Sequence, residues 1–320
     1  MPRTEQMSVF LRPQTDEERW LPECPIGESA ESDWLYYVCI QEGASATTGS
    51  LYRHHFATRS TERFRLPGRP GFVRPTGGDQ VLVGMEQQLC LFDLHAKKLT
   101  PLVTINVQDE RRVIINDGTV LDDGSVLFGT KDIEFSSPMA ELLLYRKGVI
   151  TTLRRRLTCS NGKALLDDST ILDIDTKAKS VEHLRLFQAP PSVAEAGKPI
   201  DFTCDEAFPD GMCGPIRRNG HTSVLIAMYN PHDRTHGEVR EIDVETGEIL
   251  TVWETPGSPR VTCPALVCVD HKVMLIATTA TEGMTDEQRA MHTNAGCLFW
   301  AETDFTWNDV TAPNHFPLHG

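Results

Sequence analysis

Short hydrophobic runs rich in β-branched and aromatic residues recur along this chain at a nearly constant spacing. Six of them begin at residues 33, 79, 124, 169, 221 and 271, which puts 45 to 52 residues between successive starts. Each run is followed by a second strand-like run that usually ends in a polar turn. This spacing is typical of the blades of a β-propeller. The pattern therefore predicts an all-β protein, a single six-bladed propeller over residues 1–320 with no internal domain boundary.

Three further segments complete the predicted architecture. Residues 8–11 are placed to add a strand to the last blade and so close the ring. Residues 284–290 show the one helical pattern, with Thr285 and Gln288 spaced as a capping box. Residues 188–197 are rich in Pro and Ala and predict an exposed loop.

Polar residues stand just ahead of the repeated runs, where the first strand of a blade would line the central channel. Four of the six blades carry a carboxylate or carboxamide there, and Pro209 and Gly211 flank the most constrained of these residues, Asp210. Glu28, Asn161 and Asp210 together offer only oxygen ligands and two negative charges, a set that suits a hard divalent cation. A single Asn-Gly or Asp-Gly pair is usually a turn. Recurrence in register with the repeat instead favours a metal site in the channel.

Composition narrows the possible functions. The net charge is −14, and the one basic run, residues 154–156, is interpreted as a solvated strand end, so no nucleic-acid partner is expected. No apolar run approaches the length of a membrane span, and no membrane partner and a cytoplasmic location are expected. The nine cysteines are scattered singly, which favours reduced thiols. P-loop, dinucleotide and nucleophile-elbow motifs are absent.

The ordered motifs resemble the family that contains senescence marker protein (regucalcin), gluconolactonase and the luciferin-regenerating enzyme. The resemblance covers residues 21–302 and rests most specifically on Asn116-Asp117-Gly118, Asp122-Asp123-Gly124 and Phe128-Gly129-Thr130. The segments 25–29, 160–162, 209–212, 261–265 and 283–299 match the family in order.

The resemblance implies a catalytic site in the channel. It implies one divalent ion, Ca²⁺, Mg²⁺, Mn²⁺ or Zn²⁺, held by Glu28, Asn161 and Asp210, with Asn116 and Glu134 in contact with a small-molecule substrate. The family's characteristic reaction is hydrolysis of aldonic-acid lactones. In such a reaction the metal polarises the carbonyl and activates water, and Asp210 is the candidate base.

One departure concerns the substrate. Members that act on sugar lactones typically carry Arg two residues before the Asn of the Asn-Asp-Gly motif, whereas Ile114 stands there in this chain. An alkyl group in place of a guanidinium makes that wall apolar and predicts a substrate that is less polar than a sugar lactone. Two alternatives stay open at this point. One is a non-hydrolytic, metal-dependent biosynthetic rearrangement or cyclisation, and the other is a non-catalytic Ca²⁺-binding regulatory protein. The sequence leaves the oligomeric state undetermined.

Overall fold

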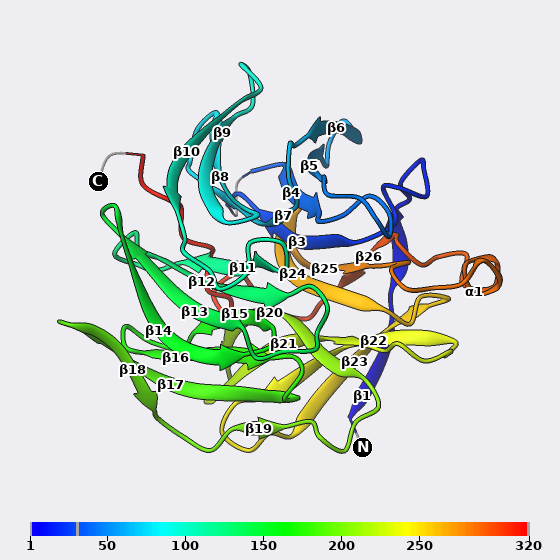
Figure 1. Ribbon diagram of the computed structural model, residues 1–320. Helices are drawn as coiled ribbons and strands as arrows, with labels where there is room; N and C mark the ends of the chain where they lie inside the picture. Colours follow the sequence, from blue (N-terminus) through cyan, green and yellow to red (C-terminus); the bar gives the residue numbers. More distant parts are fainter. Residues whose placement is uncertain (1, 30–31, 319–320) are drawn as a thin grey trace.

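Six twisted sheets arranged around a central channel make up the computed structural model (Figure 1), which describes residues 2–29 and 32–318. The architecture confirms the predicted all-β six-bladed propeller. Residues 1, 30–31 and 319–320 of the predicted 1–320 domain lie outside the described residues. The described part holds no helix long and apolar enough to span a membrane.

In each blade the chain runs from the channel outward through consecutive antiparallel strands. The first three blades are β3 (Pro22–Gly27), β4 (Trp34–Cys39), β5 (Ser50–His55) and β6 (Ser60–Arg65); β7 (Pro70–Pro75), β8 (Gln80–Met85), β9 (Gln88–Asp93) and β10 (Lys98–Thr104); and β11 (Val113–Val120), β12 (Val126–Asp132), β13 (Ala140–Arg146) and β14 (Val149–Leu157).

The last three blades depart from this simple order at their outer edges. They are β15 (Ser160–Leu165), β16 (Thr170–Asp175), β17 (Ser180–Gln188) and β18 (Pro191–Glu195), with β19 (Ile200–Asp201) also on β17; β20 (Phe208–Arg218), β21 (His221–Tyr229), β22 (His236–Asp243), β23 (Ile249–Pro256) and β1 (Arg3–Gln6); and β24 (Val261–Val269), β25 (Lys272–Thr279), β26 (Leu298–Glu302) and β2 (Ser8–Leu11).

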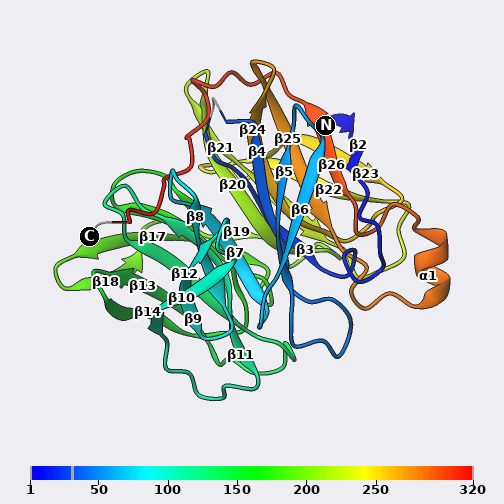
Figure 2. The same ribbon diagram turned by 90° about the horizontal axis from the view of Figure 1, so that it is seen from above.

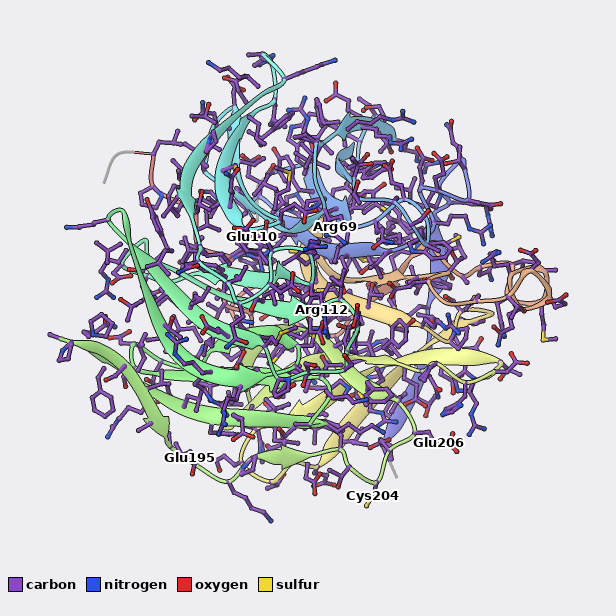
Figure 3. All side chains as sticks on the ribbon, in the orientation of Figure 1. Arg69, Glu110, Arg112, Glu195, Cys204 and Glu206 are labelled. Atoms are coloured by element: carbon purple, nitrogen blue, oxygen red, sulfur yellow. The ribbon has the colours of Figure 1, made fainter. Side chains whose placement is uncertain are left out.

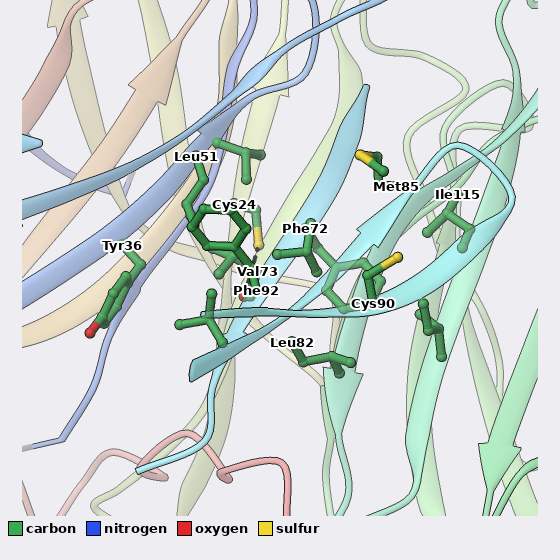
Figure 4. Close-up of a cluster of buried hydrophobic side chains, with 14 of the residues drawn as sticks. Cys24, Tyr36, Leu51, Phe72, Val73, Leu82, Met85, Cys90, Phe92 and Ile115 are labelled. Carbon is green, nitrogen blue, oxygen red and sulfur yellow. Dashed lines mark hydrogen bonds between the residues drawn. The ribbon is translucent and has the colours of Figure 1, made fainter. Parts of the chain in front are cut away.

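The hydrophobic runs that repeat in the sequence are the second strand of each blade: β4, β8, β12, β16, β21 and β25. These strands read as apolar because they are covered on both faces by the neighbouring blades, and all seven residues of β12 are buried. Figure 4 shows such an interface, where Phe72 and Leu82 of the second blade meet Leu51 of the first and Ile115 of the third.

The N-terminus joins the last two blades. β2 pairs antiparallel with β26, so that the outer strand of the sixth blade comes from the opposite end of the chain. β1 pairs parallel with β23 and adds a fifth strand to the fifth blade, an element that the sequence analysis did not anticipate. Phe10 on β2 contacts the rings of Trp300 and His54, which ties the sixth blade to the first.

Two local predictions had opposite outcomes. The helix α1 (Asp286–Met291) forms with the expected capping box between Thr285 and Gln288. The predicted loop over residues 188–197 was wrong, because β18 lies within it as the outer strand of the fourth blade. An outer strand needs one hydrogen-bonded side only, and a proline at its first residue is compatible with that position.

The C-terminal segment, residues 309–316, crosses one end of the channel (Figure 2). Val310 forms a bridge with Ile216 of the fifth blade, and the Asn314 carboxamide donates to the Val120 carbonyl of the third. Phe316 is buried and donates its N–H to Pro75 of the second blade. We call residues 309–316 the C-terminal strap.

Candidate functional site

The innermost strand of every blade carries a β-bulge near its beginning. In β11, β15 and β20 the register shifts around Asn116, Asn161 and Asp210, and in β3 it shifts directly after Glu23. A bulge places two residues opposite one and re-aims the local side chains. The sequence therefore turns polar groups from four different blades toward the channel axis at one level.

Gly211 allows the bulge of β20 to pack against the sixth blade. A Cβ atom at this residue would lie 2.5 Å from Sγ and 2.7 Å from Cα of Cys263. A backbone atom at that distance cannot yield as a flexible side chain can, so only glycine fits after Asp210.

These side chains converge on a cavity of about 320 Å³ at the end of the channel opposite the C-terminal strap. The beginnings of the inner strands form its floor, and the loops that follow second strands form its walls. Its lining consists of Leu21, Glu23, Asn116, Lys131, Ile133, Phe135, Cys159, Asn161, Thr176, Lys177, Phe208, Asp210, Tyr229, Pro231 and Glu282.

Asp210 and Asn161 are in direct contact on the cavity floor. The Asn161 carboxamide donates to the Asp210 carboxylate and also to the Thr176 hydroxyl, at 3.2 Å. Burial raises the pKa of Asp210 to about 8, against the lowering effect of the Lys131 charge and the Asn161 hydrogen bond. Asn116 lies beside them, and its carboxamide donates to the Ser160 carbonyl at 3.2 Å.

Glu23 is the second buried carboxylate of the cavity, and the sequence analysis missed it. Burial raises its pKa well above the ordinary value, and the nearby charges of Asp210 and Asp117 raise it further. Two buried carboxylates in one site repel each other and favour protonation unless a cation joins them. Glu23 thus stands where Glu28 was predicted.

The structure does not bring Glu28 to the cavity. Glu28 follows the far end of β3, five residues and roughly 15 Å of strand beyond Glu23. Its carboxylate accepts from the Ser32 hydroxyl at 2.8 Å, and its main-chain carbonyl is 2.6 Å from Nε2 of His315, a residue of the strap.

The number of residues between each floor residue and the second strand of its blade distinguishes Glu23 from Glu28. Asp210 stands 11 residues before the start of β21, Asn116 10 before β12 and Asn161 9 before β16. Glu23 stands 11 residues before β4, whereas Glu28 stands only 6 before it.

The other two predicted substrate contacts also lie outside the cavity lining. Ile114 is 1% exposed and pairs with Lys131 across β11 and β12. Glu134 is largely exposed, and its carboxylate is 3.2 Å from the Arg112 guanidinium. Arg112 itself is labelled near the centre of the view in Figure 3. The neighbouring loop residues Ile133 and Phe135 reach the cavity instead.

Buried charges behind the floor hold Asn161 in place. The Lys163 ammonium donates to the Asn161 main-chain carbonyl at 2.5 Å and to the Ser160 hydroxyl at 3.1 Å. That ammonium is also 3.3 Å from the carboxylate of Asp173, which accepts from Ser160 at 2.8 Å. The bulge of β15 is therefore fixed on its rear side by an ion pair.

The donor set of the floor fits a hard divalent cation. The carboxylates of Glu23 and Asp210 and the carboxamides of Asn116 and Asn161 are oxygen ligands of the kind such ions take. A divalent ion would also offset the mutual repulsion of the two carboxylates. Among the described residues no group of three or more His, Cys, Asp or Glu side chains could hold a metal ion. Any metal held here therefore depends on carboxamides as well as carboxylates.

Comparisons with known proteins agree with this architecture. A regucalcin from Agrobacterium tumefaciens, described as a calcium-binding protein, superimposes with a TM-score of 0.82 at 20% identity, over 99% of this chain and 100% of its own. A luciferin-regenerating enzyme gives a TM-score of 0.77 at 16% identity over 97% and 100%. A gluconolactonase from Xanthomonas campestris gives 0.61 at 13% identity over 89% and 86%.

At these identities the structural matches establish the fold alone. No curated protein sequence matches this chain at a significant level. Residues 21–280 match the sequence description of the SMP-30/gluconolactonase/LRE-like region, which covers every residue of the cavity floor. On this match the chain belongs to the SMP-30/gluconolactonase/LRE-like family.

Proposed function

We propose that this protein is a divalent-metal-dependent hydrolase that opens a lactone or a related ester. The observation that carries the proposal is the convergence of two carboxylates and two carboxamides from four blades on the floor of one cavity. The similarity to the gluconolactonase from Xanthomonas campestris supports hydrolysis of a lactone as the type of reaction. In this proposal Glu23, Asn161 and Asp210 hold the metal, and Glu23 takes the role expected of Glu28.

A divalent ion in this position would supply Lewis-acid chemistry, polarising a substrate carbonyl and making a water molecule acidic. The residues of the chain then have separate tasks. Asp210 accepts the proton of the attacking water, with its carboxylate oriented by the Asn161 carboxamide. Asn116, at the edge of the floor, donates to an oxygen of the substrate.

The walls of the cavity favour a substrate with an apolar part. Phe135, Phe208 and Tyr229 line it and provide apolar surface for the carbon skeleton of a substrate. Ile114 is absent from the cavity lining, so its alkyl group supports neither the predicted apolar wall nor the non-hydrolytic alternative. Binding of Ca²⁺ without turnover stays a possible outcome of the experiment.

The test compares two matched glutamate variants alongside Asp210→Ala. We expect Asp210→Ala and Glu23→Gln to lose bound metal and at least a hundredfold in hydrolysis of a lactone panel, since each removes a proposed ligand. Glu28→Gln should keep both, because Glu28 lies at the other end of β3. Metal content is measured by plasma mass spectrometry.

Three results would decide against the proposal in different ways. Unchanged metal content and turnover in Asp210→Ala would contradict the site itself. Loss of metal in Glu28→Gln but not in Glu23→Gln would return the ligand role to Glu28. Tight metal binding with no turnover of any ester would leave a binding protein rather than a hydrolase.

A further inference from the structure

The ammonium of Lys131 is a buried charge of the cavity to which the proposed reaction gives no task. Lys131 lies on β12, is 8% exposed and lines the cavity. Its main chain is fixed from both sides, since it pairs with Ile114 in β11 and bridges to Cys159. The side chain therefore leaves a rigid sheet and enters the cavity from the wall of the third blade.

This ammonium has no hydrogen-bond or ion-pair partner among the residues that the structure describes. Its positive charge interacts electrostatically with the carboxylates of Asp210 and Glu23, but it contacts neither of them. An ammonium has three donors, and because the Lys131 Nζ is not among the enclosed unpaired atoms of the described chain, its donors are accessible from the cavity. What satisfies them here has to occupy the cavity.

Lys163 shows what a paired lysine looks like in the same protein. Its ammonium is 3.3 Å from the Asp173 carboxylate and has two further hydrogen bonds. Lys131 lacks every contact of this kind within the described chain. A lysine serving only as counter-ion to Asp210 would be expected to close the pair in the same way.

The charges that line the cavity indicate whether its ligand is a cation or an anion. Its lining holds three carboxylates, Glu23, Asp210 and Glu282, and two ammonium groups, Lys131 and Lys177, whose formal charges sum to −1 when all five are ionised. A divalent cation on the floor changes that sum to +1. The loaded cavity is then complementary to an anion, and the free ammonium of Lys131 is positioned to receive it.

We propose that Lys131 binds a carboxylate of the substrate, so that the site selects a lactone or ester that carries a negative charge. This inference rests on the proposed hydrolase function for the reaction, but not for the binding of the anion. It also changes the expected substrate, because Ile114 by itself predicted only an apolar wall. The apolar walls would take the carbon skeleton and Lys131 its charged end.

The experiment separates binding from turnover. A cyclopentanone with a ring carboxylate and its matched carboxamide are titrated calorimetrically into the protein loaded with Mn²⁺ or Ca²⁺. These ketones resemble a lactone but cannot be hydrolysed. We expect the carboxylate to bind the wild type at least about tenfold more tightly than the carboxamide, the range of one charge-assisted hydrogen bond.

The variants assign that preference to one residue. Lys131→Met should abolish it and leave the affinity for the carboxamide within about threefold, while Lys131→Arg should keep part of it. Lys177→Met should keep most of it, because Lys177 is exposed at the mouth.

Each outcome counts for or against the inference. Equal binding of both ketones to the wild type, or an unchanged preference in Lys131→Met, would overturn it. If Lys131→Met fails to fold by circular dichroism, Lys131→Gln decides instead. Tighter binding of the carboxylate ketone without turnover of any lactone would support the anion site and contradict the hydrolase function. Lactone turnover without that binding preference would support the hydrolase function and contradict the anion site.

Discussion

The carboxamide of Asn161 depends on two buried charges that do not line the cavity. The Lys163 ammonium and the Asp173 carboxylate lie behind β15, with side chains 1% and 0% exposed. Burial raises the pKa of Asp173, although the charge of Lys163 counteracts it. Such a pair adds little net stability while it is intact but costs much when one member is removed.

We therefore expect Asp173→Ala to lower the free energy of unfolding by about 3–5 kcal/mol, because it leaves the Lys163 ammonium buried without a counter-charge. The measurement is urea unfolding followed by tryptophan fluorescence. Lys272→Ala is the control, since it breaks an ion pair whose partners are both 57% exposed and should cost less than about 1 kcal/mol. The double variant Lys163→Met, Asp173→Leu should recover the part of the loss that comes from Lys163, while the Arg154 guanidinium, 3.8 Å from Asp173 in the wild type, still loses its counter-charge. A recovery below half would argue against the pair as the cause.

At the scale of single elements, the loop after β12 shapes the wall of the cavity. The buried Asp132 carboxylate accepts from the Arg112 guanidinium at 2.7 Å and from the N–H groups of Ser137 at 2.8 Å and Ser136 at 3.0 Å. These contacts shape the segment that carries Ile133 and Phe135 to the cavity.

This loop should loosen in acid. Burial alone would raise the pKa of Asp132, but the Arg112 hydrogen bond and the backbone donors outweigh it, and the net pKa is lowered. A depressed folded pKa contributes stability above the unfolded value of about 3.9 and loses it as pH falls through the folded pKa. Hydrogen exchange over residues 133–139, corrected for intrinsic rates, should therefore rise only below about pH 4.

Asp132→Asn should produce the same increase at neutral pH, because a neutral carboxamide accepts less strongly from the guanidinium. Asp243→Asn is its matched control. That carboxylate also has a lowered pKa and accepts from backbone N–H groups, but it lies in the fifth blade. Loosening of residues 133–139 in the Asp243 variant, or none in the Asp132 variant, would disprove this role.

At the scale of the whole molecule, both chain ends hold the ring together. β2 supplies the fourth strand of the sixth blade, and the C-terminal strap contacts blades on opposite sides of the channel. In the strap, the Arg217 N–H donates to the Asp309 carbonyl at 2.7 Å, and the Phe316 N–H donates to Pro75 at 2.9 Å. The strap therefore links the second and fifth blades without lengthening either sheet.

Ending the chain after Asn308 should lower the free energy of unfolding by at least about 3 kcal/mol, the usual cost of losing one buried phenylalanine. Phe316→Ala should reproduce most of that loss, because Phe316 is 7% exposed in the core between the blades. Leu318→Ala, at a residue 40% exposed, is the control and should have little effect. Urea unfolding of the three variants tests this prediction. A truncated chain as stable as the wild type would show that the strap does not stabilise the protein.

The sequence by itself determined the number of blades, the short capped helix and three of the four floor residues. Blade number follows from the period of the second strands, because a strand packed on both faces must be apolar along its length. Asn116, Asn161 and Asp210 were identified because they stand at one point of that period, where every inner strand bulges.

Only the tertiary structure decided which other side chains enter the cavity. Four residues of β3 separate Glu23 from Glu28, and the path of this strand through the channel puts the two glutamates at opposite ends. Glu134 turns to Arg112, while Lys131, which no motif marked, enters the cavity from a second strand. These choices depend on contacts between blades that are distant in sequence, whereas periodicity reports only the burial of each segment.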